Sequence, residues 1–99
     1  MKKAVIIDFK KPSRYVNIGN NRSIPTAGII GIYDMDSSTA SPAMRKWLRD
    51  AQANGQVISV ANSLPKSIIY YDDGVRENVY FSPFASSVIQ GRIENEKNK

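Results

Sequence analysis

Two residue types are missing from this chain of 99 residues, which contains no cysteine and no histidine. Without cysteine there is no disulfide, no thiolate metal site and no thiol nucleophile. Without histidine the chain lacks the commonest general base, the commonest transition-metal ligand and the base of a Ser-His-Asp triad. These absences argue against an enzyme, and we expect neither a cofactor nor a small-molecule substrate.

Long apolar runs are missing as well. No segment approaches the roughly 20 apolar residues that a membrane-spanning helix needs. Lys2 and Lys3 precede an apolar run, but this run covers only Ala4–Ile7, whereas a secretory signal needs about 7–15 such residues. The sequence therefore predicts no contact with a membrane. The lack of cysteine is compatible with the cytoplasm, which is the location we expect.

Acidic residues are outnumbered by basic ones. The chain has 14 Lys and Arg against 9 Asp and Glu, a formal charge of +5 and a pI near 9.6. This balance favours an anionic partner such as DNA, RNA or an acidic surface. The cations gather in residues 2–14 and in residues 45–49, and the others are scattered along the rest of the chain.

Residues 42–54 carry the signals of a complete helix. Ser41 is a suitable N-cap, Pro42 fits the first helical position, and Asn54-Gly55 supplies a left-handed stop. The apolar stripe consists of Met44, Trp47, Leu48 and Ala51, and the opposite, basic face of Arg45, Lys46 and Arg49. A rigid array of cations suits a polyanion. The alternative is an ordinary solvated face.

The rest of the chain predicts an α+β fold, with a mostly antiparallel sheet of about five strands and two helices. The expected strands are residues 4–9, 15–19, 28–35 (buried) and 56–61, and a hairpin of residues 66–71 and 78–81. Ser82-Pro83 repeats the Ser-Pro helix start, so the second helix should cover residues 83–93. Residues 1–14 form a basic extension that could add a strand. Residues 94–99 contain no apolar side chain, which predicts a disordered tail.

Two features predict that the chain assembles with copies of itself. The second helix has one stripe of Phe84 and Val88 and a neighbouring stripe that includes Ile89. If one stripe covers the sheet, the other needs a second surface, unless the helix lies deep against its own sheet. Alternation sends one aromatic of each hairpin pair outward, toward another subunit or toward stacked bases. The residues expected at the subunit interface are Tyr71, Tyr80, Phe84, Val88 and Ile89.

Two other patterns hold polar residues of chemical interest. Asp34 and Asp36 lie at a strand end, where they could bind a hard cation or cap a following helix. No phosphate-binding loop accompanies them, so we favour capping and predict no metal site. Residues 17–21 combine a glycine with asparagines but lack the spacing of a dinucleotide fingerprint.

Several local patterns occur together in an order that resembles a known family. They are Val16–Asn20 (VNIGN), the isoleucine-rich strand ending in Tyr33-Asp34, Ser41–Gly55, Leu64–Tyr70 (LPKSIIY) and Val79–Ser87 (VYFSPFASS). Residues 15–93 resemble the RemA/RemB family of bacterial extracellular-matrix (biofilm) regulators. The Leu-Pro-Lys-Ser and Ser-Pro…Ser-Ser elements are more similar to the RemB branch.

The resemblance implies a small α+β subunit that assembles into a closed ring and, in the RemA branch, presents arginines to DNA. RemA-like members have an arginine entering the isoleucine-type strand, where this chain has Ala27-Gly28. They also have an arginine-rich turn where this chain reads Ser63–Lys66 (SLPK), so only Lys66 keeps a cation. The resemblance therefore supports ring assembly of this chain more strongly than it supports DNA binding.

The first hypothesis from the sequence is a non-enzymatic, ring-forming homo-oligomer that binds DNA through phosphates and regulates transcription of extracellular-matrix genes. The residues expected to contact DNA are Lys66, Arg45, Lys46, Arg49, Lys10, Lys11 and Arg14. The alternative is a structural or scaffolding ring that binds a protein partner without DNA, which the missing arginines favour.

Overall fold

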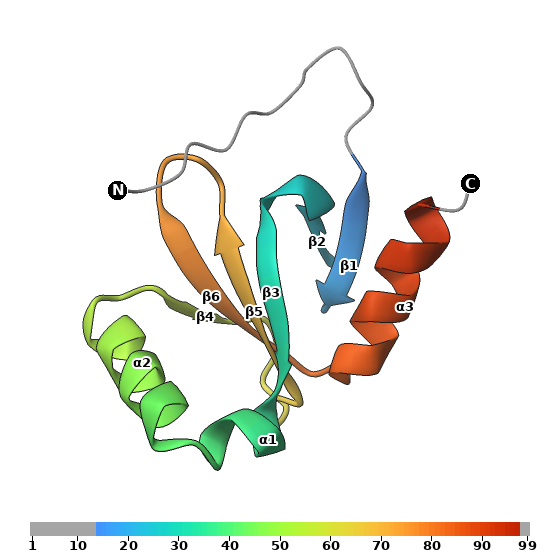
Figure 1. The fold of residues 1–99 in the computed structure, drawn as a ribbon. Coiled ribbons are helices and arrows are strands. Elements are labelled where there is room, and N and C mark those ends of the chain that lie inside the picture. The colour runs from blue at the N-terminus through green and yellow to red at the C-terminus, as the bar shows by residue number, and fades with distance from the viewer. Residues whose placement is uncertain (1–13, 98–99) are drawn as a thin grey trace.

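A four-stranded sheet forms the middle layer of the molecule (Figure 1). In the computed structural model, whose described residues are 14–97, its strand order is β3-β5-β6-β4. The bounds are β3 Ile29–Asp34, β5 Ser67–Asp72, β6 Glu77–Ser82 and β4 Val57–Ser59. The pairs β3–β5 and β5–β6 are antiparallel, and β4–β6 is parallel. The α+β class and the mostly antiparallel sheet are therefore confirmed.

Different elements cover the two faces of this sheet. Helix α2 (Pro42–Ala53) packs on one face, and the hairpin of β1 (Tyr15–Gly19) and β2 (Arg22–Pro25) packs on the other together with α3 (Ser86–Lys97) (Figure 1). The short helices η1 (Thr26–Gly28) and α1 (Met35–Thr39) connect these parts. The described residues thus contain three α-helices and two sheets, of two and four strands. The sequence predicted two helices and about five strands.

Strand β5 is apolar on both sides because the sheet is covered on both faces. Ile68 joins the cluster of Leu48, Ala51 and Val79 under α2. Its neighbour Ile69 points the other way, into the larger cluster under the hairpin and α3. Two-sided burial explains a continuous apolar run in place of strict alternation.

Helix α2 begins and ends as its sequence predicts. The Ser41 hydroxyl accepts a hydrogen bond from the Met44 N–H at 3.4 Å, and Pro42 is the first helical residue. Asn54 is the C-cap, and Gly55 follows with a φ of 70°. The local capping signals therefore account for both ends of this helix.

The predicted start of the second helix is wrong. Ser82 is fully buried at the end of β6, where its hydroxyl donates to the Ile18 carbonyl at 2.6 Å and accepts from the Phe84 N–H at 3.0 Å. Ser82 therefore belongs to β6 and to its contact with β1, and α3 begins only at Ser86. Helix α3 also continues to Lys97, so residues 94–97 are helical and do not form the expected disordered tail. Lys and Glu are good helix formers even when no apolar face is buried.

Two local expectations between residues 28 and 40 are also corrected. The strand expected to be buried is an edge strand, β3, and its Ile30 side chain is 54% exposed. No helix was expected between the strand at residues 28–35 and the helix at 42–54, yet Met35–Thr39 form helix α1, which Asp34 caps by accepting from the backbone N–H of Ser37 at 3.1 Å. Capping was the favoured interpretation of this aspartate, but the helix that it was expected to precede was the one at residues 42–54. The strand expected at residues 4–9 lies outside the described residues.

Candidate nucleic-acid interface

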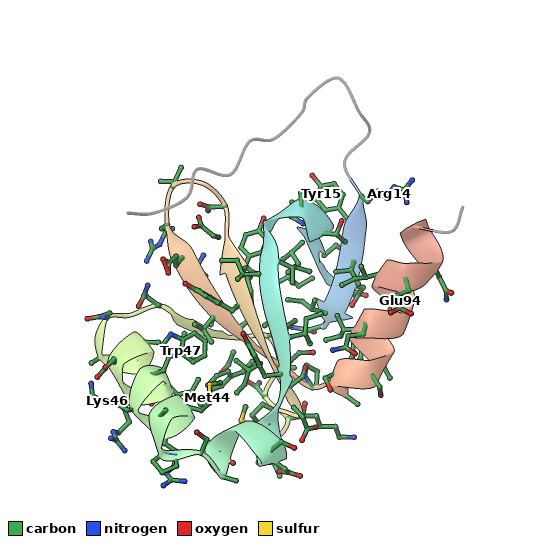
Figure 2. The ribbon with its side chains drawn as sticks, in the orientation of Figure 1. Arg14, Tyr15, Met44, Lys46, Trp47 and Glu94 are labelled. Atoms are coloured by element: carbon green, nitrogen blue, oxygen red, sulfur yellow. The ribbon has the colours of Figure 1, made fainter. Side chains whose placement is uncertain are left out.

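The basic face of α2 points away from the sheet. Arg45, Lys46 and Arg49 are all exposed, whereas Trp47 on the same helix points inward (Figure 2). Helical periodicity produces this division, because the residues at positions 44, 47, 48 and 51 share the face that packs on β5 and β6. The three cations are therefore held on a rigid element, available to a partner.

Two of these cations have partners within the chain. The Arg45 guanidinium donates from Nη1 to the Thr39 carbonyl at 2.7 Å, which satisfies a carbonyl at the C-terminal end of α1. Lys46 Nζ lies 3.0 Å from Asp50 Oδ2, in an exposed i, i+4 ion pair. Arg49 has no hydrogen bond or ion pair within residues 14–97. Of the three cations on this face, Arg49 is therefore the one whose charged group is most available to bind a phosphate.

Lys66 lies near this face, at the other end of α1. Its backbone carbonyl accepts from the Met35 N–H at 3.0 Å, and Met35 is the first residue of α1. Arg45 contacts the last residue of the same helix, Thr39. Because five helical residues span only about 7.5 Å, Lys66 and Arg45 belong to one side of the molecule. Three acidic residues, Asp34, Asp36 and Asp50, lie among the cations and lower the local potential.

The remaining predicted DNA contacts do not join this surface. Arg14 precedes β1, and Figure 2 places it on the opposite side of the molecule from Lys46. Lys10 and Lys11 lie outside the described residues. The fold of one chain therefore brings together Arg45, Lys46, Arg49 and Lys66 and leaves Arg14 apart.

Three of the predicted interface residues are enclosed in the core. Tyr71, Tyr80 and Ile89 are 6%, 5% and 0% exposed, respectively, and pack against the β1–β2 hairpin. The hairpin already covers that face, so these three side chains have little surface left to contact another subunit. Phe84 is half-buried, and Val88 is 44% exposed and available to a partner.

Other exposed apolar side chains escaped the sequence analysis. Ile30 and Tyr33 lie on the edge strand β3, Leu64 precedes β5, and Val75 lies at the tip of the β5–β6 hairpin. Their exposure depends on which strand forms the edge of the sheet, and no local pattern encodes strand order. Leu64 and Val75 sit in predicted loops, where an isolated large apolar residue was the available signal.

The outward aromatics expected on the hairpin are not offered to bases. Tyr70 lies under α2, where its ring and that of Tyr33 both meet Trp47 edge-on, with centroid distances of 5.3 and 6.4 Å. Tyr70 also donates a hydrogen bond to Glu77. This bond, reinforced by burial, raises the pKa of Tyr70 to about 12. The aromatic group fastens α2 to the sheet.

Comparison of the chain with known protein families and with curated protein sequences finds no match. Within residues 14–97 no helix has both the length and the apolar character needed to cross a bilayer. In the same part of the chain, no three carboxylates gather into a candidate metal site.

Proposed function

We propose that the chain is a non-enzymatic, oligomeric DNA-binding regulator of transcription of extracellular-matrix (biofilm) genes in the bacterial cytoplasm. The observation that supports it is the exposed basic face of α2, held rigidly and extended by Lys66. The biological process rests on the resemblance to the RemA/RemB family. Phosphate contacts from these side chains release counterions and position the duplex, without reading its sequence.

The charge distribution supports the proposal that the chain assembles. Each subunit contributes a few cations interleaved with Asp34, Asp36 and Asp50, so its own field is weak. A closed ring repeats the basic face around one circumference, and repeated cations sum into a potential that attracts a polyanion. The exposed Val88, Ile30 and Tyr33 offer apolar surface for subunit contacts.

A scaffolding ring that binds a protein partner is the second candidate. The engagement of Arg45 with Thr39 and of Lys46 with Asp50 favours it, because both contacts give these cations a role within the subunit. In that case the oligomer forms, and DNA does not bind to it at any salt concentration.

The DNA contact is tested with Arg49→Gln in the full chain, with Arg76→Gln as the matched control. Arg76 is exposed beyond β5, and its loss changes the net charge equally. In an electrophoretic shift assay at several salt concentrations, the wild type should lose affinity steeply, with log K falling by about 0.9 per phosphate neutralised. Arg49→Gln should reduce this salt slope by about 1 for each subunit in contact, and Arg76→Gln should leave it unchanged.

Two results decide between the candidates. An oligomer that shows no shift up to about tens of micromolar protein, well within ordinary non-specific affinities, contradicts DNA binding and supports the scaffold. Light scattering that reports a monomer at every concentration contradicts both candidates. A Val88→Glu variant that dissociates, compared with Gln90→Glu on the same helix, would place the subunit contact on α3.

A further inference from the structure

A groove of about 630 Å³ lies between the β1–β2 hairpin and α3, on the side of the sheet opposite α2. Its lining mixes polar and apolar side chains and, among the described residues, contains no acidic one. The lining residues are Tyr15, Val16, Asn17, Asn20, Asn21, Phe84, Arg92 and Asn95. The volume falls in the range of about 300–1,000 Å³ that is usual for small-molecule sites. Of the residues proposed to contact DNA, those that the structure describes (Lys66, Arg45, Lys46, Arg49 and Arg14) do not line this groove.

The Arg92 guanidinium is fixed in the groove by two contacts. It lies over the ring of Phe84, 4.8 Å from the ring centroid, and donates from Nη1 to the Asn17 carbonyl at 3.1 Å. A guanidinium has five N–H donors, so most of its donors stay available. A cation held in one orientation loses little freedom when it binds an anion.

Two of the asparagine side chains are anchored at one end only. Asn17 Oδ1 accepts from the Gly19 N–H at 2.8 Å, which leaves the amide NH₂ of Asn17 to face another group. Asn20 Nδ2 donates to the Val60 carbonyl at 3.3 Å, which leaves its Oδ1. Asn20 and Asn21 hold the hairpin turn with positive φ angles of 50° and 59°, a conformation that asparagine tolerates better than most residues. The amides are thus oriented before any ligand arrives.

The side chains of the groove divide into a donor-rich part and a flat part. Arg92, Asn17, Asn21 and Asn95 supply N–H donors around a single positive charge, and Asn21 and Asn95 form no side-chain hydrogen bond within the described residues. The exposed ring of Tyr15 offers a face for a planar group. An oxyanion attached to a planar ring is complementary to both parts, because charge-assisted bonds from a guanidinium are strong and directional.

We propose that the groove between the β1–β2 hairpin and α3 binds a small organic anion, a phosphate or carboxylate joined to a planar ring, with Arg92 holding the oxyanion and the asparagine amides and Tyr15 holding the ring. A nucleoside monophosphate is the natural representative of the phosphate class. The site is separate from the basic face of α2 and goes beyond the proposed regulation of transcription.

The test is a titration of the full chain followed by the NMR signals of its backbone and asparagine amides. The probes are adenosine 5′-monophosphate, phenyl phosphate, benzoate, adenosine and inorganic phosphate. Saturable shifts of the groove amides should appear with dissociation constants below about 1 mM, a modest affinity. Phenyl phosphate and benzoate distinguish the phosphate source from the carboxylate source. Adenosine and inorganic phosphate each lack half of the ligand and should bind at least about tenfold more weakly.

Two pairs of variants assign the binding to the groove. Arg92→Gln should weaken binding about tenfold, the loss typical of one charge-assisted contact, and Arg76→Gln should leave it unchanged. Asn95→Asp places a negative charge in the groove at an exposed helical position, and Gln90→Glu adds the same charge to α3 outside it. Asn95→Asp should weaken binding severalfold, and Gln90→Glu should not.

Three results overturn the proposal: no probe saturates, the shifts map to α2 instead of the groove, or Asn95→Asp and Gln90→Glu behave alike. Failure of DNA binding is distinguishable from these results. Arg49→Gln acts only on the DNA salt slope and should leave the groove's affinity unchanged.

Discussion

The chain contains two Ser-Pro dipeptides, each just before a helix, and they have different roles. At Ser41-Pro42 the hydroxyl of a half-buried serine caps α2. At Ser82-Pro83 the serine is fully buried, bonds to Ile18 across the fold, and the helix starts later. The same dipeptide thus caps a helix in one region and joins two distant strands in the other.

The difference lies in what surrounds each dipeptide. Helix α2 packs on one face of the four-stranded sheet, and its ends are set by capping residues next to them in the sequence. On the α3 side the β1–β2 hairpin, β6 and the start of α3 meet, and Gly19 and Pro83 touch there. Polar groups that are buried must find partners, and that requirement outweighs a capping preference.

Replacing one glycine in each region, Gly19 near α3 and Gly55 after α2, should give the largest difference in the free energy of unfolding. Gly19 has a φ of +125°, and a Cβ there would lie 2.7 Å from Pro83 Cδ, whereas Gly55 has a φ of +70° and open space around it. Gly19→Ala combines backbone strain with a clash and should cost about 4 kcal/mol of unfolding free energy. Gly55→Ala should cost about 1 kcal/mol. Urea unfolding measures both, and equal losses would contradict the packed junction.

The serines should give an intermediate contrast. Ser82→Ala leaves the Ile18 carbonyl and the Phe84 N–H without their partner, and should cost about 2 to 4 kcal/mol in the free energy of unfolding. Ser41→Ala removes one cap bond that is long, at 3.4 Å, and should cost about 1 kcal/mol or less. If the Ser41 variant is the less stable of the two, the burial argument for Ser82 is wrong.

The attachment of α2 should give the smallest effect, visible only at high pH. The hydrogen bond to Glu77, with burial, raises the pKa of Tyr70 from 10.0 to about 12. The folded state therefore holds the phenol proton more tightly than the unfolded chain. This stabilisation is complete below pH 10 and is lost as the pH rises through about 12.

The experiment compares the free energy of unfolding against pH for the wild type and Tyr70→Phe. The wild type should lose stability through this window, and Tyr70→Phe should lose less. A residual slope is expected, since burial also raises the pKa of Tyr71. Glu77→Gln removes the carboxylate and should return the pKa of Tyr70 toward its ordinary value. An unchanged profile in both variants would show that the Tyr70–Glu77 bond does not act on stability.

The candidate site was predictable in part. The periodicity of α2 placed Arg45, Lys46 and Arg49 on one solvent face, because a helix turns its sequence into faces without help from the rest of the chain. That Lys66 lies on the same side, and Arg14 on the other, follows from the short helix α1 and from the place of β1. Both positions depend on contacts between residues far apart in sequence, and no local sequence pattern predicts such contacts.

The groove was not predictable. Residues 17–21 lack the spacing of a dinucleotide fingerprint, so the sequence predicted no binding site there. Arg92 was one of several cations that belong to no cluster in the sequence. The two segments become one surface because α3 packs beside β1 and Arg92 reaches the Asn17 carbonyl. Tyr71 and Tyr80 show the reverse case, since the hairpin covers aromatics that alternation alone would expose.

The sequence by itself determined the α+β class, the ends and faces of α2 and the β5–β6 hairpin. Each depends on hydrogen bonds and side-chain periods within a few residues. The tertiary structure alone decided strand order, the exposure of β3, the start of α3 and the polar groove. Those features depend on which distant surfaces exclude water from one another, and burial changes what a serine, a tyrosine or an arginine can bind.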